Sequence, residues 1–310
     1  MNYQDIPYHS GKIVVLGDLH YDSFRRFALC PINMCALQDI IENADALILA
    51  GDLTNGPAKN WARVFHYLSK FIQPERIYAL PGNHDYYGGL LSDDPALKKA
   101  AENAGAHFVQ KQALLHGDTR IFCCTLWTDF NLSGDASIAM HEADRGMADY
   151  DWIGAPVDPR VSWEDLPIMW QQRRLKPREI LRVHQDHRAW LDDSLASPHP
   201  IGKGGKTVVV THHGPHPAAA GEIDTLSAAF HSDLDSMIEQ HRPDVWFFAH
   251  SHRRICAKVH EIEIRNISIG YLDEVIDLRG SYLREKSVWK SRRADARQVQ
   301  TLYEDTNDQR

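Results

Sequence analysis

Short apolar runs alternate along the chain with segments whose apolar residues have helical spacing. The strand-like runs cover residues 12–16, 46–50, 76–80, 121–125, 206–211 and 245–249. The helical spacing predicts helices over residues 61–72, 94–105 and 226–238, and a further helix with Ile180, Val183, His187 and Leu191 on one face. Strands and helices that alternate in this way indicate an α/β fold built in layers.

Two parts of the chain depart from this alternation. Residues 129–175 are polar, contain several prolines and carry Trp152, Trp163 and Trp170. A stretch of this length without periodicity is usually functional or mobile, and its tryptophans favour packing onto the main body. We therefore expect a single domain over residues 1–278 with an insertion at 129–197. Residues 279–310 predict a basic C-terminal tail, either solvated or, as the weaker alternative, in contact with nucleic acid.

The amino-acid composition argues against several classes of protein. The net charge of −8 gives no global signal for nucleic acid or an anionic membrane, and the 8 Trp, 11 Tyr and 10 Phe argue against a disordered chain. No apolar run approaches the roughly 20 residues that span a bilayer, and residues 1–12 lack the core of a signal peptide. Five cysteines, an odd number, do not form a disulfide or zinc framework. We expect a reduced, cytoplasmic protein.

Candidate chemistry appears where the strand-like runs end. Five of the runs lead directly into residues that commonly bind metals: Asp18 and His20, Asp52, Asn83 with His84 and Asp85, His212 with His213, and His250 and His252. The carboxyl ends of strands in an open α/β sheet share one edge, so these side chains are expected to meet there. A mixture of imidazole, carboxylate and amide ligands suits Mn, Fe, Zn or Co better than Mg or Ca.

This ordered series of motifs resembles the calcineurin-like metallophosphoesterase superfamily, over residues 12–275. The resemblance implies a four-layer αββα sandwich of two mixed β-sheets flanked by helices, with a dinuclear centre of two divalent metal ions. By motif, Asp18, His20 and His252 would bind the first metal, Asp52 would bridge both, and Asn83, His212 and His250 would complete the second. His84 would be a histidine beside the scissile phosphate that binds no metal, supported by Asp85. Further stretches resemble a bacterial subgroup of uncharacterised phosphoesterases.

The resemblance and the residues lead to one main hypothesis. A metal-bridging hydroxide attacks phosphorus, and His84 protonates the leaving oxygen as a general acid. Three other residues are candidate substrate contacts: His213, whose alternative role is support of the site, and Arg253 and Arg254, which otherwise face solvent. We expect a phosphatase or phosphodiesterase acting on a small or nucleotide-like substrate.

Two alternatives to this hypothesis remain. One is a metal-dependent nuclease, which the acidic net charge does not favour, and the other is a scaffold without catalysis, which the complete ligand set does not favour. The sequence leaves open the physiological substrate, the native metals, the oligomeric state and the preference between monoesters and diesters.

Overall fold

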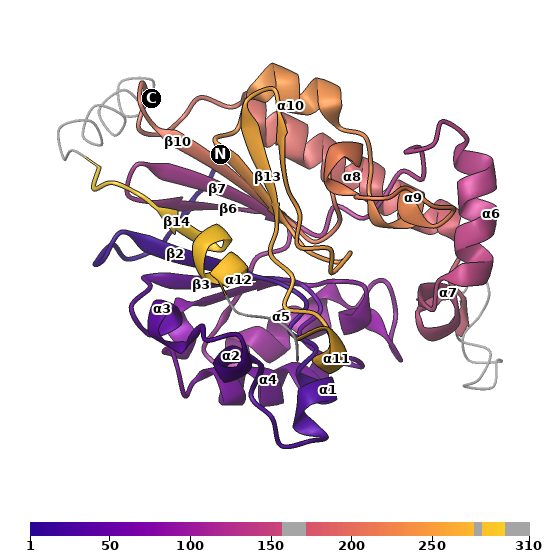
Figure 1. The fold of residues 1–310 in the computed structure, drawn as a ribbon, viewed down its shortest axis with the longest axis horizontal. Coiled ribbons are helices and arrows are strands. Elements are labelled where there is room, and N and C mark those ends of the chain that lie inside the picture. Colours follow the sequence, from indigo (N-terminus) through magenta and orange to yellow (C-terminus); the bar gives the residue numbers. More distant parts are fainter. Residues whose placement is uncertain (157–171, 276–280, 295–310) are drawn as a thin grey trace, which may run out of the picture.

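Two large β-sheets lie face to face, and helices cover both outer faces (Figure 1). The computed structural model describes residues 1–156, 172–275 and 281–294. In spatial order the seven-stranded sheet consists of β1 (Gln4–Asp5), β6 (Gln112–His116), β7 (Thr119–Cys124), β10 (Lys206–Thr211), β11 (Val245–Phe248), β13 (Ile262–Asn266) and β12 (Cys256–Val259). The five-stranded sheet consists of β14 (Val288–Lys290), β2 (Lys12–Leu16), β3 (Ala46–Ala50), β4 (Ile77–Leu80) and β5 (His107–Phe108). A small hairpin pairs β8 (Gly154–Pro156) with β9 (Gln172–Arg174).

Parallel pairing at the centre of each sheet brings the carboxyl ends of the strands to one edge. In the five-stranded sheet β2, β3, β4 and β5 are parallel and β14 is antiparallel to β2. In the seven-stranded sheet β10 is parallel to both β7 and β11, and β6 is parallel to β1. The pairs of β6 with β7 and of β12 with β13 are antiparallel. Both sheets are therefore mixed, and the predicted four-layer αββα arrangement is confirmed.

The helices enclose these sheets. They are α1 (Tyr21–Arg25), α2 (Pro31–Met34), α3 (Gln38–Glu42), α4 (Trp61–Leu68), α5 (Asp94–Asn103), α6 (Ala136–Gly146), α7 (Asp149–Trp152), α8 (Pro177–Ala196), α9 (Ser227–Phe230), α10 (Asp235–His241), α11 (Leu272–Val275) and α12 (Ser281–Lys286). In the ranges that the structure describes, none of them combines the length and the apolar content needed to cross a bilayer.

Two expectations about helices are wrong. The helix predicted over residues 226–238 is divided into α9 and α10, because His231 between them is extended and forms a bridge with Gly214. The stretch expected to lack periodic structure contains α6, which begins where the Asp135 side chain accepts hydrogen bonds from the N–H groups of Ser137 and Ile138. Only Ala139 and Ala143 of this helix are buried, so it shows little apolar pattern. The middle of the expected insertion, residues 157–171, lies outside the described residues.

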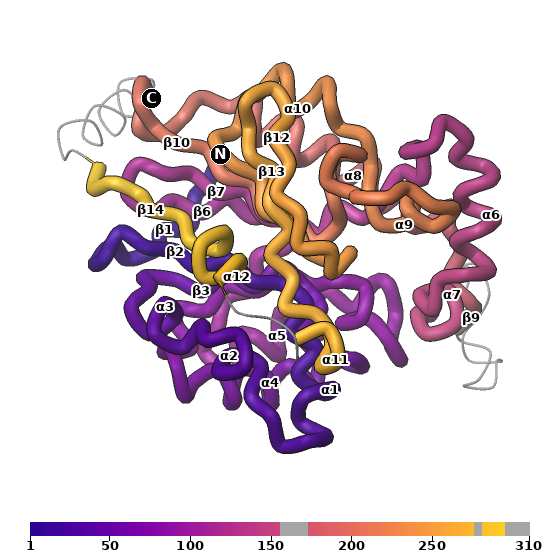
Figure 2. Tube along the Cα trace, viewed as in Figure 1, coloured from indigo at the N-terminus to yellow at the C-terminus, as the bar shows by residue number. Residues whose placement is uncertain are grey.

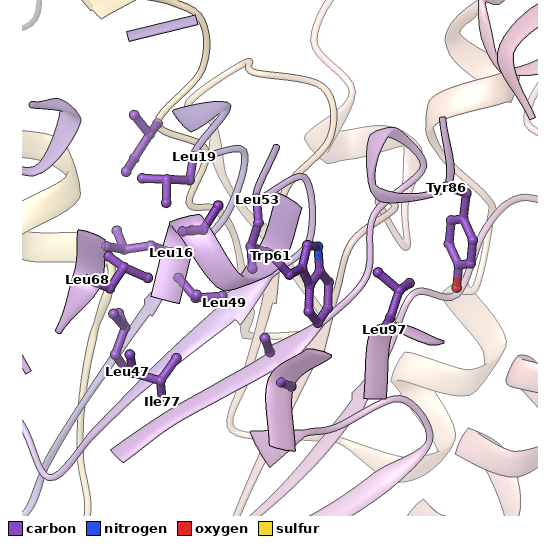
Figure 3. Packing of buried hydrophobic residues seen from close by; sticks show 14 of the residues in the cluster. Leu16, Leu19, Leu47, Leu49, Leu53, Trp61, Leu68, Ile77, Tyr86 and Leu97 are labelled. Carbon is purple, nitrogen blue, oxygen red and sulfur yellow. The ribbon is translucent and has the colours of Figure 1, made fainter. Parts of the chain in front are cut away.

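Alternation along the strands divides the apolar side chains into three layers. Ile13 and Val15 of β2 lie in the cluster between the two sheets, whereas Val14 and Leu16 belong to the cluster under the helices of the five-stranded sheet. Figure 3 shows part of this outer cluster, in which Trp61 packs among leucines from the strands and their loops. The third cluster lies between the seven-stranded sheet and the helices α8 and α10.

The chain after residue 280 returns to the five-stranded sheet. Strand β14 pairs with β2 in the register Trp289 with Ile13, and Figure 2 shows this yellow segment running beside the indigo start of the chain. The Trp289 indole donates to the Thr119 hydroxyl at 3.1 Å and packs against the cluster between the sheets. The described part of the expected basic tail thus forms α12 and the edge strand β14, and residues 279–280 and 295–310 lie outside the described residues.

A buried polar network joins residues 9–11 to Ser291 at the opposite edge from the candidate ligands. Asp45, just before β3, accepts hydrogen bonds from the N–H groups of His9, Ser10 and Gly11. It also accepts from His116 Nε2 at 2.9 Å, and His116 Nδ1 bonds to the Ser291 hydroxyl at 2.9 Å. Burial alone would raise the pKa of Asp45, but the N–H groups of Ser10 and His9 outweigh it and hold this pKa well below its usual value.

This network generates a prediction about stability and pH. Replacing Asp45 by Asn removes the charge that the N–H groups solvate and should lower the free energy of unfolding by about 1–3 kcal/mol at pH 7. The pKa of Asp45 is lower in the folded state, so its contribution exists above the unfolded pKa of about 4 and is lost as the pH falls through the folded pKa. Urea unfolding of both proteins between pH 7 and pH 3 measures the difference.

The exposed Asp193→Asn variant is the matched control and should unfold like the original protein at every pH. Equal stability of the Asp45→Asn variant and the original protein at pH 7 would show that the network does not stabilise the fold.

Candidate metal centre

Loops that follow five parallel strands deliver polar side chains to one place between the two sheets. The loop after β2 carries Asp18 and His20, the loop after β3 carries Asp52, and the loop after β4 carries Asn83 and His84. The other sheet contributes His212 after β10, and His250 and His252 after β11. All the predicted ligands are buried except His252, which is largely covered.

One group of donors is formed by Asp18, His20 and His252, whose donor atoms lie within 4.8 Å of one another. The Nε2 atoms of His20 and His252 are 3.1 Å apart, and Asp18 Oδ1 lies 3.6 Å from His252 Nε2. Asp18 Oδ1 is buried and has no hydrogen-bond partner among the described residues. Nitrogen and oxygen donors that converge in this way form a pocket suited to a cation.

A second group of donors is formed by Asp52, His212 and His250, also within 4.8 Å of one another. Asp52 Oδ1 lies 3.5 Å from His212 Nε2, and the amide oxygen of Asn83 lies 3.0 Å from the same nitrogen. The other carboxylate oxygen, Asp52 Oδ2, lies 3.8 Å from Nε2 of His20, which belongs to the first group. The carboxylate of Asp52 therefore lies between the two groups of donors.

The electrostatics of these groups fit divalent cations. Burial, followed by the charge of Asp18, raises the pKa of Asp52 well above its usual value, so a nearby positive charge would favour its ionised form. Burial lowers the pKa of His20 and His250, and neighbouring imidazoles lower it further. Neutral imidazoles are the form that binds metal ions. The buried and unpartnered atoms Asp18 Oδ1 and His250 Nε2 are consistent with such ligands.

Backbone strain is concentrated at the same residues. Asp18, His20, Asp52, His250 and His252 all have φ between 38° and 66°, a region that residues other than glycine seldom adopt. Strain of this kind costs about 1–3 kcal/mol per residue and gathers at functional sites, where surrounding structure holds it.

Glycines allow the loops to approach one another at the site. A Cβ atom on Gly51 would lie 2.5 Å from His212 Nδ1, and one on Gly82 would lie 2.5 Å from His212 Cε1. Only glycine therefore fits in these loops while His212 keeps its position.

Hydrogen-bond partners outside the two groups of donors orient the candidate ligands. His212 Nδ1 bonds to the carbonyl of Ala50 at 2.8 Å, and His252 Nδ1 bonds to Glu274 Oε2 at 2.8 Å. The Asn83 amide donates to Asp149 Oδ1 at 2.7 Å, which turns its oxygen toward His212. Such outer contacts set which atom of a ligand faces a metal.

Sequence reasoning missed Asp149 and Glu274 as members of the site. Asp149 lies in the expected insertion, and no local motif connects either residue to the ligands. Nothing in the sequence reveals these long-range contacts.

His84 lies beside the two groups, but its partner differs from the expected one. Its Nε2 atom is 3.9 Å from Asp52 Oδ2, and its Nδ1 atom is 2.5 Å from the side-chain oxygen of Asn55. The carboxylate of Asp85, expected to support His84, instead accepts hydrogen bonds from the N–H groups of Asp52 and Gly82 and from the indole of Trp61. The expectation that Asp85 orients His84 is corrected: Asp85 holds the ligand loops, because its buried oxygens are occupied by their N–H groups.

The three expected substrate contacts are packed against or bonded to other groups of the protein. His213 is buried, with its ring centroid 4.1 Å from that of His250. The Arg253 guanidinium donates to the carbonyls of Ala220 and Glu222, both at 2.6 Å.

The Arg254 guanidinium donates to the carbonyls of Ser268 and Ile269. Both arginines therefore hold neighbouring backbone segments. A separate group of donors, Asp235, Glu239 and His260, lies outside this site on and beside α10.

Comparisons with known proteins relate the chain to one family. Residues 11–254 match the family model of the calcineurin-like phosphoesterases. The solved structure of a phosphopantetheinyl hydrolase from Mycobacterium tuberculosis aligns with a TM-score of 0.60 and 13% identity, over 91% of this chain and 96% of that chain, which shows a shared fold. A protein from Staphylococcus aureus, named as a candidate 5'-nucleotidase, aligns with a TM-score of 0.44 and 15% identity, over 84% of this chain and 49% of that chain. No curated protein matches the sequence.

The contact between Asn83 and Asp149 generates a prediction about metal affinity. Replacing Asp149 by Ala leaves the Asn83 amide free to rotate, and we expect metal affinity to fall by about 10–100-fold. Titration of the metal-free protein with Mn²⁺, followed by calorimetry, measures this change. The Asp149→Asn variant keeps an acceptor oxygen and should recover part of the affinity, and the exposed Asp193→Ala variant should match the original protein. Unchanged affinity in a folded Asp149→Ala variant would contradict this role.

Proposed function

The chain belongs to the calcineurin-like phosphoesterase family, and from that premise we propose that it is a phosphatase or phosphodiesterase that uses two divalent ions on a small or nucleotide-like substrate. Metal-dependent hydrolysis of phosphoesters is the chemistry of this family. The observation that carries the proposal is the position of the Asp52 carboxylate, whose two oxygens lie 3.5 Å from His212 Nε2 and 3.8 Å from His20 Nε2.

We assign the first ion to Asp18, His20 and His252 and the second to Asn83, His212 and His250, with Asp52 shared. The mixed nitrogen and oxygen donors favour Mn, Fe, Zn or Co. When bound, two such ions supply a nucleophile from water at neutral pH and stabilise negative charge on the phosphoryl oxygens. Two divalent ions also offset the charges of the buried carboxylates, so an anionic substrate suits this site despite the net charge of −8.

The assigned role of His84 is to donate a proton to the leaving oxygen. The side-chain oxygen of Asn55 accepts from Nδ1 of His84, which leaves Nε2 directed toward Asp52 and the hydroxyl of Tyr271. Burial lowers the pKa of the His84 imidazole to about 3, so the negative charge of a bound phosphoryl group would have to raise it. The proton would then pass from Nε2 to the oxygen of the leaving group as its bond to phosphorus breaks. Asp85 contributes indirectly, because it anchors the backbone that presents Asp52 and Asn83.

Two substitutions separate these roles. Replacing His84 by Ala should lower kcat by about 10²–10⁴-fold, because the proton donor is lost while every assigned ligand remains. Replacing Asp52 by Ala should lower bound metal as well as activity. Metal analysis of the purified variants, together with hydrolysis of a phosphomonoester, measures both effects. The exposed His66→Ala variant is the matched control, and full activity in both site variants would refute the mechanism.

A substrate panel separates the proposed function from the alternatives. We expect the Mn²⁺-loaded protein to hydrolyse a small phosphomonoester or phosphodiester faster than single-stranded DNA, because the two arginines beside His252 are already bound to backbone carbonyls. Cleavage of the DNA without turnover of the small substrates would favour the nuclease. Absence of hydrolysis for every substrate in a protein with bound metal would favour the scaffold.

A further inference from the structure

A row of three rings leads from the candidate metal centre to the surface. The centroids of His84 and Tyr87 are 4.2 Å apart with planes at 30°, and those of Tyr87 and Trp152 are 6.4 Å apart with planes at 20°. We call His84, Tyr87 and Trp152 the aromatic row. Trp152, at its outer end, is 61% exposed. A single exposed apolar side chain is ordinary, but this one continues a stack that begins at the proposed proton donor.

The aromatic row is held in place by its backbone and by the site itself. The carbonyl of Trp152 accepts a hydrogen bond from the N–H of Gly88 at 2.7 Å, and Gly154 exchanges backbone bonds with the segment of Gly89 and Leu91. The Tyr87 hydroxyl donates to Asp149 Oδ1 at 2.7 Å, the same oxygen that orients Asn83. Because a ring held in advance loses little freedom on binding, a fixed row suits recognition of a flat group.

A hollow of about 340 Å³ lies beside the outer ring, lined by Trp152, the glycines 88, 89 and 154, and Arg173 and Arg174. Both arginines are already paired. The Arg173 guanidinium bonds to both carboxylate oxygens of Glu179, at 2.7 and 2.5 Å, and Arg174 bonds to Asp144 and Asp151. Since each of these described cations has an acidic partner, the hollow suits an uncharged group better than a second phosphate.

We propose that the aromatic row and this hollow form the subsite for the leaving group, and that the substrate esterifies phosphate to an uncharged alcohol with a planar aromatic group. The inference rests on the proposed function. The leaving group lies on the same side of the site as His84 only if His84 donates its proton to the leaving oxygen. Stacking on an exposed indole binds such a group through its face, without a specific set of hydrogen bonds. A simple aryl alcohol and a nucleoside share this chemistry.

Binding of phosphonates to the Mn²⁺-loaded protein tests the subsite without requiring turnover. Calorimetry should show that Trp152→Ala lowers the affinity for phenylphosphonate by about tenfold. The affinity for methylphosphonate, which has no ring, should change by less than about twofold. Trp152→Phe should restore most of the affinity for phenylphosphonate. Phe27→Ala, which removes another exposed aromatic side chain, should have no effect.

Adenosine 5'-monophosphate in the same titrations distinguishes a nucleoside from a simple aryl group. A loss of affinity in Trp152→Ala for either aromatic compound, without a loss for methylphosphonate, supports the subsite and identifies the source of the ring. The subsite would be overturned if Trp152→Ala lowers the affinity for all compounds equally or for none of them. It would also be overturned if the original protein does not bind the aromatic compounds. If these compounds bind as expected but no phosphoester is hydrolysed, the proposed function fails, and the aromatic row is a binding subsite for a planar group but not for a leaving group.

Discussion

The structure depends on the free-energy cost of burying the carboxylates of Asp18 and Asp52 close together, and on the imidazoles and cations that offset this cost. Two carboxylates without solvent repel each other, and the pKa of Asp52 rises well above its usual value as a result. Imidazoles from both sheets surround these two carboxylates, and together they form a set of donors that favours cations. The strained backbone at five of the ligands adds to this free-energy cost. The site therefore weakens the fold locally, and we infer that it is kept for its chemistry.

The layered fold makes this arrangement feasible. Parallel strands in both sheets end at one edge, so short loops from distant parts of the sequence meet there without long excursions. At the opposite edge, the network of Asp45, His116 and Ser291 joins residues 9–11 and the segment after β14 to the same sandwich. The strained loops therefore lie at one edge of a sandwich whose opposite edge contains a buried hydrogen-bond network.

Sequence patterns within a short stretch of chain predicted the central strands and most of the candidate ligands. Apolar runs identified the central strands, and the polar residues that end them identified the candidate ligands. Asp149, Asn55 and Trp152 had no such signal, because their importance comes from contacts with residues far away in the sequence. Strand β14 was missed for a similar reason: its three residues carry little pattern, and only its pairing with β2 defines it.

In the proposed centre, the Asp52 carboxylate lies between two metal ions. A crystal structure of the Mn²⁺-loaded protein, with anomalous diffraction recorded near the manganese edge, would locate both ions. We expect two anomalous peaks about 3.5–4 Å apart, with one Asp52 oxygen beside each. A single peak, or peaks located only at the separate group of Asp235, Glu239 and His260, would contradict it.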